Sequence, residues 1–252
     1  MKNFSLILLD CDGVLVDSEP LACVADALAT DAYGDPTRRM TPAVAMARFT
    51  GISTADMQHI LRSDYGVEDF DGWTALKEKH LTNLFKSELF AVSGVMETLD
   101  ALDRAHFPYC VASNSGHRRL SFTFRCTGLS ERMAGRIFSA EDVKEGKPAP
   151  DLHLLAARTM GFAPEDCLVI DDSPSGILGA KRAGMTAWGF TGTNRQGERW
   201  IEALKKAGAD RIVDDFRMLR EVLEAQPERE AKVDACNGAP AAHNQNTFYQ
   251  EN

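Results

Sequence analysis

The 252-residue sequence lacks both a long apolar run and an excess of basic residues. Its longest apolar stretches, such as residues 6–9, fall far short of the roughly 20 residues that a membrane-spanning helix requires. With 28 Lys and Arg against 37 Asp and Glu, the formal net charge is −9. Nucleic acids and anionic membranes both bind through a basic face, so we expect neither as a partner.

Closely spaced cysteine pairs are also absent. The six cysteines show no C-x-x-C spacing, which argues against a zinc site or a disulfide framework. Several lie in apolar runs, where free cysteine packs as a small hydrophobic side chain. The N-terminal segment shows no cleavage region of a secretory signal, so we expect a cytoplasmic monomer. The cysteines are Cys11, Cys23, Cys110, Cys126, Cys167 and Cys236.

Short β-rich apolar runs alternate with helical periods along much of the chain, which is typical of βα units that build a parallel sheet. Strands are expected at residues 4–9, 109–112, 136–138, 168–170, 186–189 and, with a weaker pattern, 211–213. Helices are expected at residues 95–104, 152–160 and 177–183. We therefore predict an α/β fold with a Rossmann-like parallel sheet, which binds ligands beyond the carboxyl ends of its strands.

Residues 19–90 interrupt this alternation, because they contain three apolar stripes at helical spacing and no convincing strand. We expect a helical domain inserted after the first strand, above that strand's end. The alternative is that these helices cover one face of the sheet. Residues 1–18 and 91–225 would form the α/β core. Residues 226–252 lose periodicity and gain Asn, Gln, Ala and Pro, which predicts a disordered tail.

The first polar segment of interest follows the first predicted strand, where Asp10 and Asp12 precede Gly13. Residues i and i+2 of an extended strand point the same way, so the two carboxylates would repel each other. A bound cation removes this conflict, and Mg²⁺ prefers carboxylate and carbonyl oxygens. Taken alone, however, two acids at the end of a strand are better explained as solubilising loop residues.

Three further segments carry polar residues near the ends of predicted strands. They contain Ser113, Asn114 and Ser115, then Lys147 in a loop with two prolines, and finally Asp171 and Asp172. Each has an ordinary explanation by itself, as a helix cap, an exposed loop lysine or acids at a strand end. Together with the first segment, they would gather four acids, a hydroxyl and a lysine at one edge of the sheet, which indicates a functional site.

This set, in this order and spacing, resembles the haloacid dehalogenase-like (HAD) superfamily of phosphotransferases. The superfamily's first motif, D-x-D-G-[TV], matches residues 10–14. Its later motifs, a Ser or Thr, a Lys and an acidic pair, match Ser113, Lys147 and Asp171-Asp172. The resemblance runs from residue 4 to about residue 225. It identifies residues 19–90 with the helical cap domain of the sugar-phosphate phosphatase and β-phosphoglucomutase branch.

The resemblance implies a role for each matching residue. Asp10 would be the nucleophile that forms an aspartyl-phosphate, and Asp12 the general acid and base. The transferring phosphoryl oxygens would be bound by Ser113, Lys147 and backbone N–H groups near Gly13 and Asn114. A magnesium ion would be held by the Asp10 carboxylate, the Asp12 carbonyl, Asp172 and, directly or through water, Asp171.

Within the superfamily, the residues present favour a magnesium-dependent phosphatase acting on a small sugar, polyol or sugar-acid phosphate. By resemblance, β-phosphoglucomutases carry a His and an Arg at the positions that align with Ala22 and Thr54. A dehalogenase would not need Asp12 or the acidic pair, and no cap lysine of a phosphonate-cleaving enzyme stands out. The mutase and a non-catalytic binding protein on the same scaffold are the alternatives.

A few residues outside the motifs are weaker candidates. The loop at residues 50–54 should face the active site and set specificity, by analogy with the branch. His117 could reach the cleft, although an exposed helix position is the simpler explanation. Three cap lysines could contact a second anionic group of the substrate, but a solvated helix face is the better explanation of them: Lys77, Lys79 and Lys86.

Overall fold

The structure, a computed structural model, describes residues 3–219 and 222. These residues contain a six-stranded sheet in the order β3-β2-β1-β4-β5-β6, with every neighbouring pair parallel. The predicted α/β fold with a Rossmann-like sheet is therefore confirmed. The strands are β1 (Leu6–Leu9), β2 (Tyr109–Ser113), β3 (Ile137–Ser139), β4 (Cys167–Asp171), β5 (Thr186–Phe190) and β6 (Arg211–Val213).

All six predicted strands are present, but some of their ends differ from the prediction. β1 begins at Leu6 rather than at residue 4. β2 and β4 extend to Ser113 and Asp171, which the sequence pattern had placed just beyond the strands. The extension arises because backbone pairing continues past the apolar run, with Ser113 opposite Ser139 and Asp171 opposite Gly189. Two polar side chains are thereby fixed in the register of the sheet.

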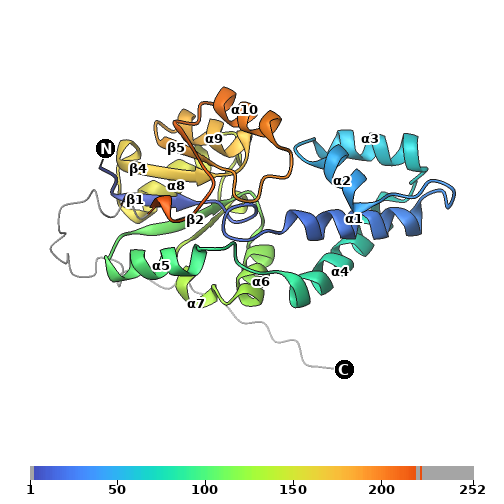
Figure 1. Cartoon of the computed structure of the whole chain (residues 1–252), viewed down its shortest axis with the longest axis horizontal. Coiled ribbons are helices and arrows are strands. Elements are labelled where there is room, and N and C mark those ends of the chain that lie inside the picture. Colours follow the sequence, from blue (N-terminus) through green and yellow to red (C-terminus); the bar gives the residue numbers. More distant parts are fainter. Residues whose placement is uncertain (1–2, 220–221, 223–252) are drawn as a thin grey trace.

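Strand β1 shows how the sheet builds a core on each of its faces. Ile7 and Leu9 belong to a cluster with residues of α5 (Val95–Arg104) and α6 (His117–Thr127). Leu6 and Leu8 belong to a second cluster with residues of α8 (Asp151–Met160), α9 (Pro174–Arg182) and α10 (Glu198–Ala207). Successive side chains of a strand point to opposite faces, so the central strand serves both cores. The result is three layers, helices–sheet–helices (Figure 1).

The remaining elements on the sheet side are short. They are α7 (Ser130–Met133) and two 3₁₀ turns, η1 (Ala140–Asp142) and η2 (Pro164–Asp166). Because both faces of the sheet are covered, side chains that follow the strands reach solvent only at the strand ends. A ligand site is therefore expected at the carboxyl edge.

Helices α1 (Glu19–Tyr33), α2 (Pro42–Phe49), α3 (Thr54–Tyr65) and α4 (Phe70–Glu88) follow β1 in the chain, and we call them the helical insert. They share an apolar cluster of their own, in which the buried Trp73 indole donates a hydrogen bond to Thr30 Oγ1 at 3.1 Å. In Figure 1 the insert extends beyond one end of the sheet rather than over its faces. The division into a core and a separate cap domain stays a prediction.

Two further expectations concern the ends and the polarity of the chain. The tail predicted at residues 226–252 lies outside the described residues. Within residues 3–219 and 222, no helix combines the length and the apolar character that crossing a membrane would require. The five cysteines among these residues are all free thiols.

Candidate active site

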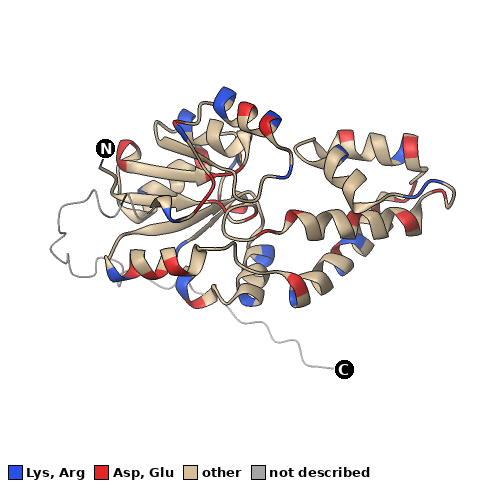
Figure 2. Ribbon diagram, in the orientation of Figure 1, with Lys and Arg blue, Asp and Glu red and all other residues tan. Residues whose placement is uncertain are grey.

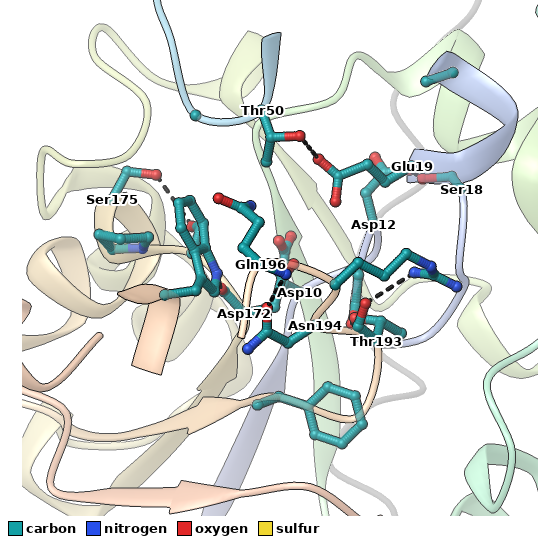
Figure 3. Close-up of a pocket in the computed structure, with 18 of the residues that line it drawn as sticks. Asp10, Asp12, Ser18, Glu19, Thr50, Asp172, Ser175, Thr193, Asn194 and Gln196 are labelled. Carbon is teal, nitrogen blue, oxygen red and sulfur yellow. Dashed lines mark hydrogen bonds between the residues drawn. The ribbon is translucent and has the colours of Figure 1, made fainter. Parts of the chain in front are cut away.

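The predicted site residues meet at the carboxyl ends of β1, β2 and β4. Asp10 directly follows β1, and its N–H donates to the carbonyl of Ile170 at 3.0 Å. Asp171 ends β4 and Ser113 ends β2. Asp10, with Asp12 and Asp172, lines a cavity of about 650 Å³ whose other wall comes from the helical insert (Figure 3).

Lys147 is the buried cation of the site. Its Nζ lies 3.0 Å from Asp10 Oδ1 and 2.7 Å from Asp171 Oδ2, and the residue is only 8% exposed. Burial disfavours a charged amine, but the two carboxylates outweigh it and raise the pKa of Lys147. The lysine is therefore held as a cation beside the predicted nucleophile. Its backbone lies in a loop with a cis bond to Pro148.

Burial is the main influence on the pKa of Asp10. Burial, helped by the carboxylates of Asp171 and Asp12, raises the pKa of Asp10 to about 7, although Lys147 counteracts the shift. Burial and the neighbouring carboxylates of Asp171 and Asp10 also raise the pKa of Asp172 well above its ordinary value. This excess of buried carboxylates is the condition that a bound cation would relieve.

Three of these carboxylates could share one metal ion. Asp10, Asp171 and Asp172 each offer an oxygen, and the three oxygens lie within 4.8 Å of one another. An all-oxygen set of this kind suits a hard divalent cation. The structure distinguishes the two adjacent acids, since Asp171 is fully buried and accepts hydrogen bonds from Lys147 and Ser173, whereas Asp172 lines the cavity.

Asp12 is held by donors that come from two different segments. Its carboxylate accepts hydrogen bonds from the hydroxyl of Ser18, from Ser115 Oγ at 2.8 Å and from Arg119 Nη2 at 3.4 Å. Burial alone would raise the pKa of Asp12, but Arg119 and the two hydroxyl groups lower it below its ordinary value. The hydrogen bonds at both of its oxygens thus orient the Asp12 carboxyl group beside Asp10.

Two predicted phosphate-binding residues have different surroundings from each other. Ser113 is buried, and its Oγ accepts a hydrogen bond from the Ser115 N–H at 3.2 Å. The Asn114 side chain is paired with the backbone of Lys147 in both directions, at 3.0 and 2.9 Å. Through its side chain, Asn114 therefore fixes the lysine loop, and only its backbone N–H stays a candidate for binding phosphate.

The outer part of the cavity is formed by residues that no motif indicated. Thr50 of the insert donates a hydrogen bond to the Glu19 carboxylate at 2.5 Å, and both face the cavity (Figure 3). Opposite them, the loop after β5 contributes Thr193, Asn194, Arg195 and Gln196. This loop is tied to the first motif, because Thr193 Oγ1 donates to the Gly13 carbonyl at 2.7 Å.

Trp200 joins the insert to the acidic loop. Its indole N–H donates to the Asp172 carbonyl at 2.8 Å, and its ring lies against Gly51 of the insert.

The sequence predicted that residues near Thr50 face the site, and Thr50 and Gly51 do line the cavity. The sequence patterns did not indicate three residues that contact the site, Ser18, Arg119 and Trp200. No local pattern marked them, because each acts through a contact with a residue distant in sequence or outside its own element.

His117 and the three lysines of the insert, which were weaker candidates for substrate contacts, do not line the 650 Å³ cavity. The His117 ring contacts Asp142 at 2.7 Å. Lys77 forms an ion pair with Asp26 at 2.6 Å within the insert. Lys79 and Lys86 line a second cavity of about 810 Å³ between α4 and α6, and Figure 2 marks the basic residues of both helices in blue.

Comparison with known proteins identifies the class to which this fold and site belong. The sequence profile of the haloacid dehalogenase-like hydrolases matches residues 4–184, so the chain is a member of that family. Together with its phosphatase relatives, this makes the protein a hydrolase that acts on phosphate monoesters.

Several similar proteins are named as phosphatases of small molecules. The chain is 28% identical over 195 residues to the 6-phosphogluconate phosphatase of Escherichia coli, covering 75% of this chain and 84% of the relative. It is 29% identical over 181 residues to hexitol phosphatase A of the same organism, covering 70% and 78%. The phosphorylated carbohydrates phosphatase of Thermotoga maritima is 27% identical over 222 residues, covering 86% and 99%.

Two solved structures of the same family share the fold of this chain. A hydrolase of the family from Deinococcus radiodurans, solved with bound phosphate and sodium, superposes with a TM-score of 0.74 at 31% identity, covering 87% of this chain and 95% of that one. A haloacid dehalogenase-like protein of unknown function from Agrobacterium tumefaciens gives a TM-score of 0.75 at 31% identity, covering 88% and 99%.

Proposed function

We propose that the protein is a magnesium-dependent phosphatase that hydrolyses a small sugar, polyol or sugar-acid phosphate through an aspartyl-phosphate. One observation carries this proposal: the Asp10 carboxylate lines the cavity while a buried lysine and two further acids surround it. A carboxylate in this position can attack a phosphoryl group, and Lys147 can neutralise charge on the transferring oxygens.

The proposed reaction has two steps. An Asp10 oxygen forms a bond to phosphorus as the bond from phosphorus to the ester oxygen breaks, and Asp12 gives a proton to the departing alkoxide. A water molecule, which loses a proton to Asp12, then attacks phosphorus and releases inorganic phosphate and the Asp10 carboxylate. General acid–base assistance of this kind commonly contributes about 10²–10⁴-fold.

The residues fit a magnesium ion, because the donor set is all oxygen and its carboxylates are crowded. Asp10, Asp172 and the backbone carbonyl of Asp12 would hold the ion, with Asp171 ligating it directly or through water. When bound, the ion would neutralise the carboxylates and the phosphate oxygens. The backbone N–H groups near Gly13 and Asn114, with Ser113, would bind the phosphoryl oxygens.

The remaining cavity favours hydrolysis of a small polar ester. Glu19, Thr50 and Gln196 offer oxygen and amide groups that suit a hydroxylated leaving group. Relatives named for 6-phosphogluconate, hexitol phosphates and phosphorylated carbohydrates support the same substrate range.

Ala22 lines the cavity at the position where mutases, by resemblance, carry a histidine, so the mutase alternative has no support there. We propose that the helical insert acts as the cap that closes over the ester.

The proposal is tested by phosphate release from p-nitrophenyl phosphate and a panel of sugar, polyol and sugar-acid phosphates. We expect turnover that requires Mg²⁺, disappears with a chelator and is lost in Asp10→Asn. Asp71→Asn, at an exposed position of α4, makes the same chemical change away from the site and should keep full activity. Magnesium-dependent turnover that survives in Asp10→Asn would refute the nucleophile, and no release from any ester would favour a binding protein.

A further inference from the structure

Arg119 belongs to none of the four motifs, yet it joins Asp12 to the helical insert. Its Nη2 is 3.4 Å from Asp12 Oδ1, and its guanidinium carbon lies 5.4 Å from the centre of the Phe85 ring of α4. The residue lines both the 650 Å³ cavity and the 810 Å³ cavity between α4 and α6. One side chain of α6 therefore contacts the first motif and the insert at once.

The Asp12 carboxylate is fixed at both of its oxygens. Oδ1 accepts from Ser18 and Arg119, and Oδ2 accepts from Ser115. Both serine hydroxyls are neutral and lie on short side chains. Arg119 supplies the positive charge and is the partner that also contacts α4. Binding at both oxygens prevents the carboxylate from rotating, and that restriction keeps a general acid aligned with its target.

One N–H group of the Arg119 guanidinium has no hydrogen-bond partner among the described residues. The group is Nε, and it is buried. A buried donor without an acceptor costs free energy, so this position of the guanidinium is not the one that satisfies the side chain best. The position of the head group is instead set by Asp12 on one side and by the Phe85 ring on the other, through a cation–π contact.

We propose that Arg119 is a positioning residue that aligns Asp12 with the leaving-group oxygen, and that the Phe85 ring holds the guanidinium in the position that this alignment requires. The inference rests on the phosphatase activity proposed above. Phe85 itself belongs to the apolar cluster of the sheet core and stacks on Phe122 of α6, so its ring is a fixed support for the guanidinium.

The experiment compares two esters that differ in their need for a proton. p-Nitrophenolate leaves readily without protonation, whereas the alkoxide of a sugar or polyol phosphate requires a general acid. We expect Arg119→Ala to reduce kcat/KM, which reports the step that expels the leaving group, at least tenfold more for the alkyl ester than for p-nitrophenyl phosphate. Arg119→Lys should restore part of this difference, and Phe85→Leu, which removes the ring and keeps Arg119, should shift the ratio in the same direction.

Arg118→Ala is the matched control, because the neighbouring side chain is exposed and makes no contact with Asp12 among the described residues. Its ratio of alkyl to aryl turnover should equal that of the unmodified protein. Thermal unfolding of each variant separates loss of fold from loss of alignment, and a folded Arg119→Ala or Arg119→Lys protein is sufficient for the comparison. An unchanged ester ratio in the folded Arg119 variants would overturn the proposal while leaving the phosphatase activity established. An unmodified protein that cleaves neither ester would refute both.

Discussion

The Asp172 carboxylate occupies the space in which a Cβ atom on Gly13 would lie. Gly13 also has a φ of +81°, which is costly for residues with a side chain. Two separate reasons therefore require a glycine at position 13. Its backbone has a positive φ, and the Asp172 carboxylate, more than 150 residues later in the chain, leaves no room for a side chain. This close approach brings Asp172 to Asp10.

We predict that Gly13→Ala displaces Asp172 and impairs magnesium-dependent turnover. The expected fall in kcat/KM is at least about 10²-fold, which is the loss typical of a positioned group that is displaced by about 1 Å. Gly161→Ala is a suitable control, because its φ is also positive at +82° but nothing lies within 4 Å of the new methyl group. Both variants bear the backbone strain, so only Gly13→Ala should lose activity. Equal losses in the two proteins would show that strain, rather than the displaced carboxylate, is responsible.

Replacing Lys147 should affect stability as well as catalysis. Lys147→Met leaves the buried Asp10 and Asp171 without their cation, and breaking a buried ion pair in this way typically costs about 3–5 kcal/mol. We expect a lower free energy of unfolding in urea together with a loss of turnover. Lys181→Met removes the surface ion pair with Asp210 and should cost less than about 1 kcal/mol. Similar costs for the two substitutions would contradict the structural assignment of Lys147.

The adjacent acids should respond differently to amide substitution. Asp172 lines the cavity, so Asp172→Asn is expected to keep the fold and to abolish the rise in unfolding temperature that Mg²⁺ gives the unmodified protein. Asp171 is fully buried and paired with Lys147, so Asp171→Asn should lower the unfolding temperature even without metal. Thermal melts with and without Mg²⁺ distinguish these outcomes. A full Mg²⁺ response in Asp172→Asn would rule out its role as a ligand.

His153 should make the fold sensitive to acid. Its ring is fully buried on α8, neither nitrogen has a hydrogen-bond partner among the described residues, and burial, with Lys147 adding to it, lowers its pKa to about 3. Below the ordinary pKa of 6.5, the unfolded chain takes up a proton that the folded protein does not bind. Stability therefore falls with decreasing pH by about 1.4 kcal/mol per unit between pH 6.5 and 3.

This contribution can be isolated by comparing the protein with His153→Leu. The difference in free energy of unfolding between the two should change by about 2 kcal/mol in favour of the variant from pH 6.5 to pH 5. Urea titrations at both pH values measure it, and the other acid-sensitive groups cancel because they are common to both proteins. Parallel stability curves for the two proteins would mean that His153 is protonated in the folded state.

Several features of the site were accessible from sequence because they follow from local rules. The alternation of apolar runs and helical periods was enough to predict the six strands. Asp10, Ser113 and Asp171 were found because each follows or ends an apolar run, and the strands that carry them are neighbours in the sheet. Arg119 was not found, because its importance depends on where the first motif and α4 lie relative to α6. No local pattern encodes that position.

The sequence by itself determined the elements, the order of the motifs and the collection of acids and a lysine at one edge, because periodicity and strand ends are local properties. Only the tertiary structure decided which acid of the Asp171-Asp172 pair faces the cavity, since adjacent residues point in opposite directions and the packing of the sheet selects one of them. It also decided that the Asn114 side chain binds the Lys147 backbone and that Arg119 joins Asp12 to the insert. These contacts join residues that are distant in sequence, so packing alone establishes them.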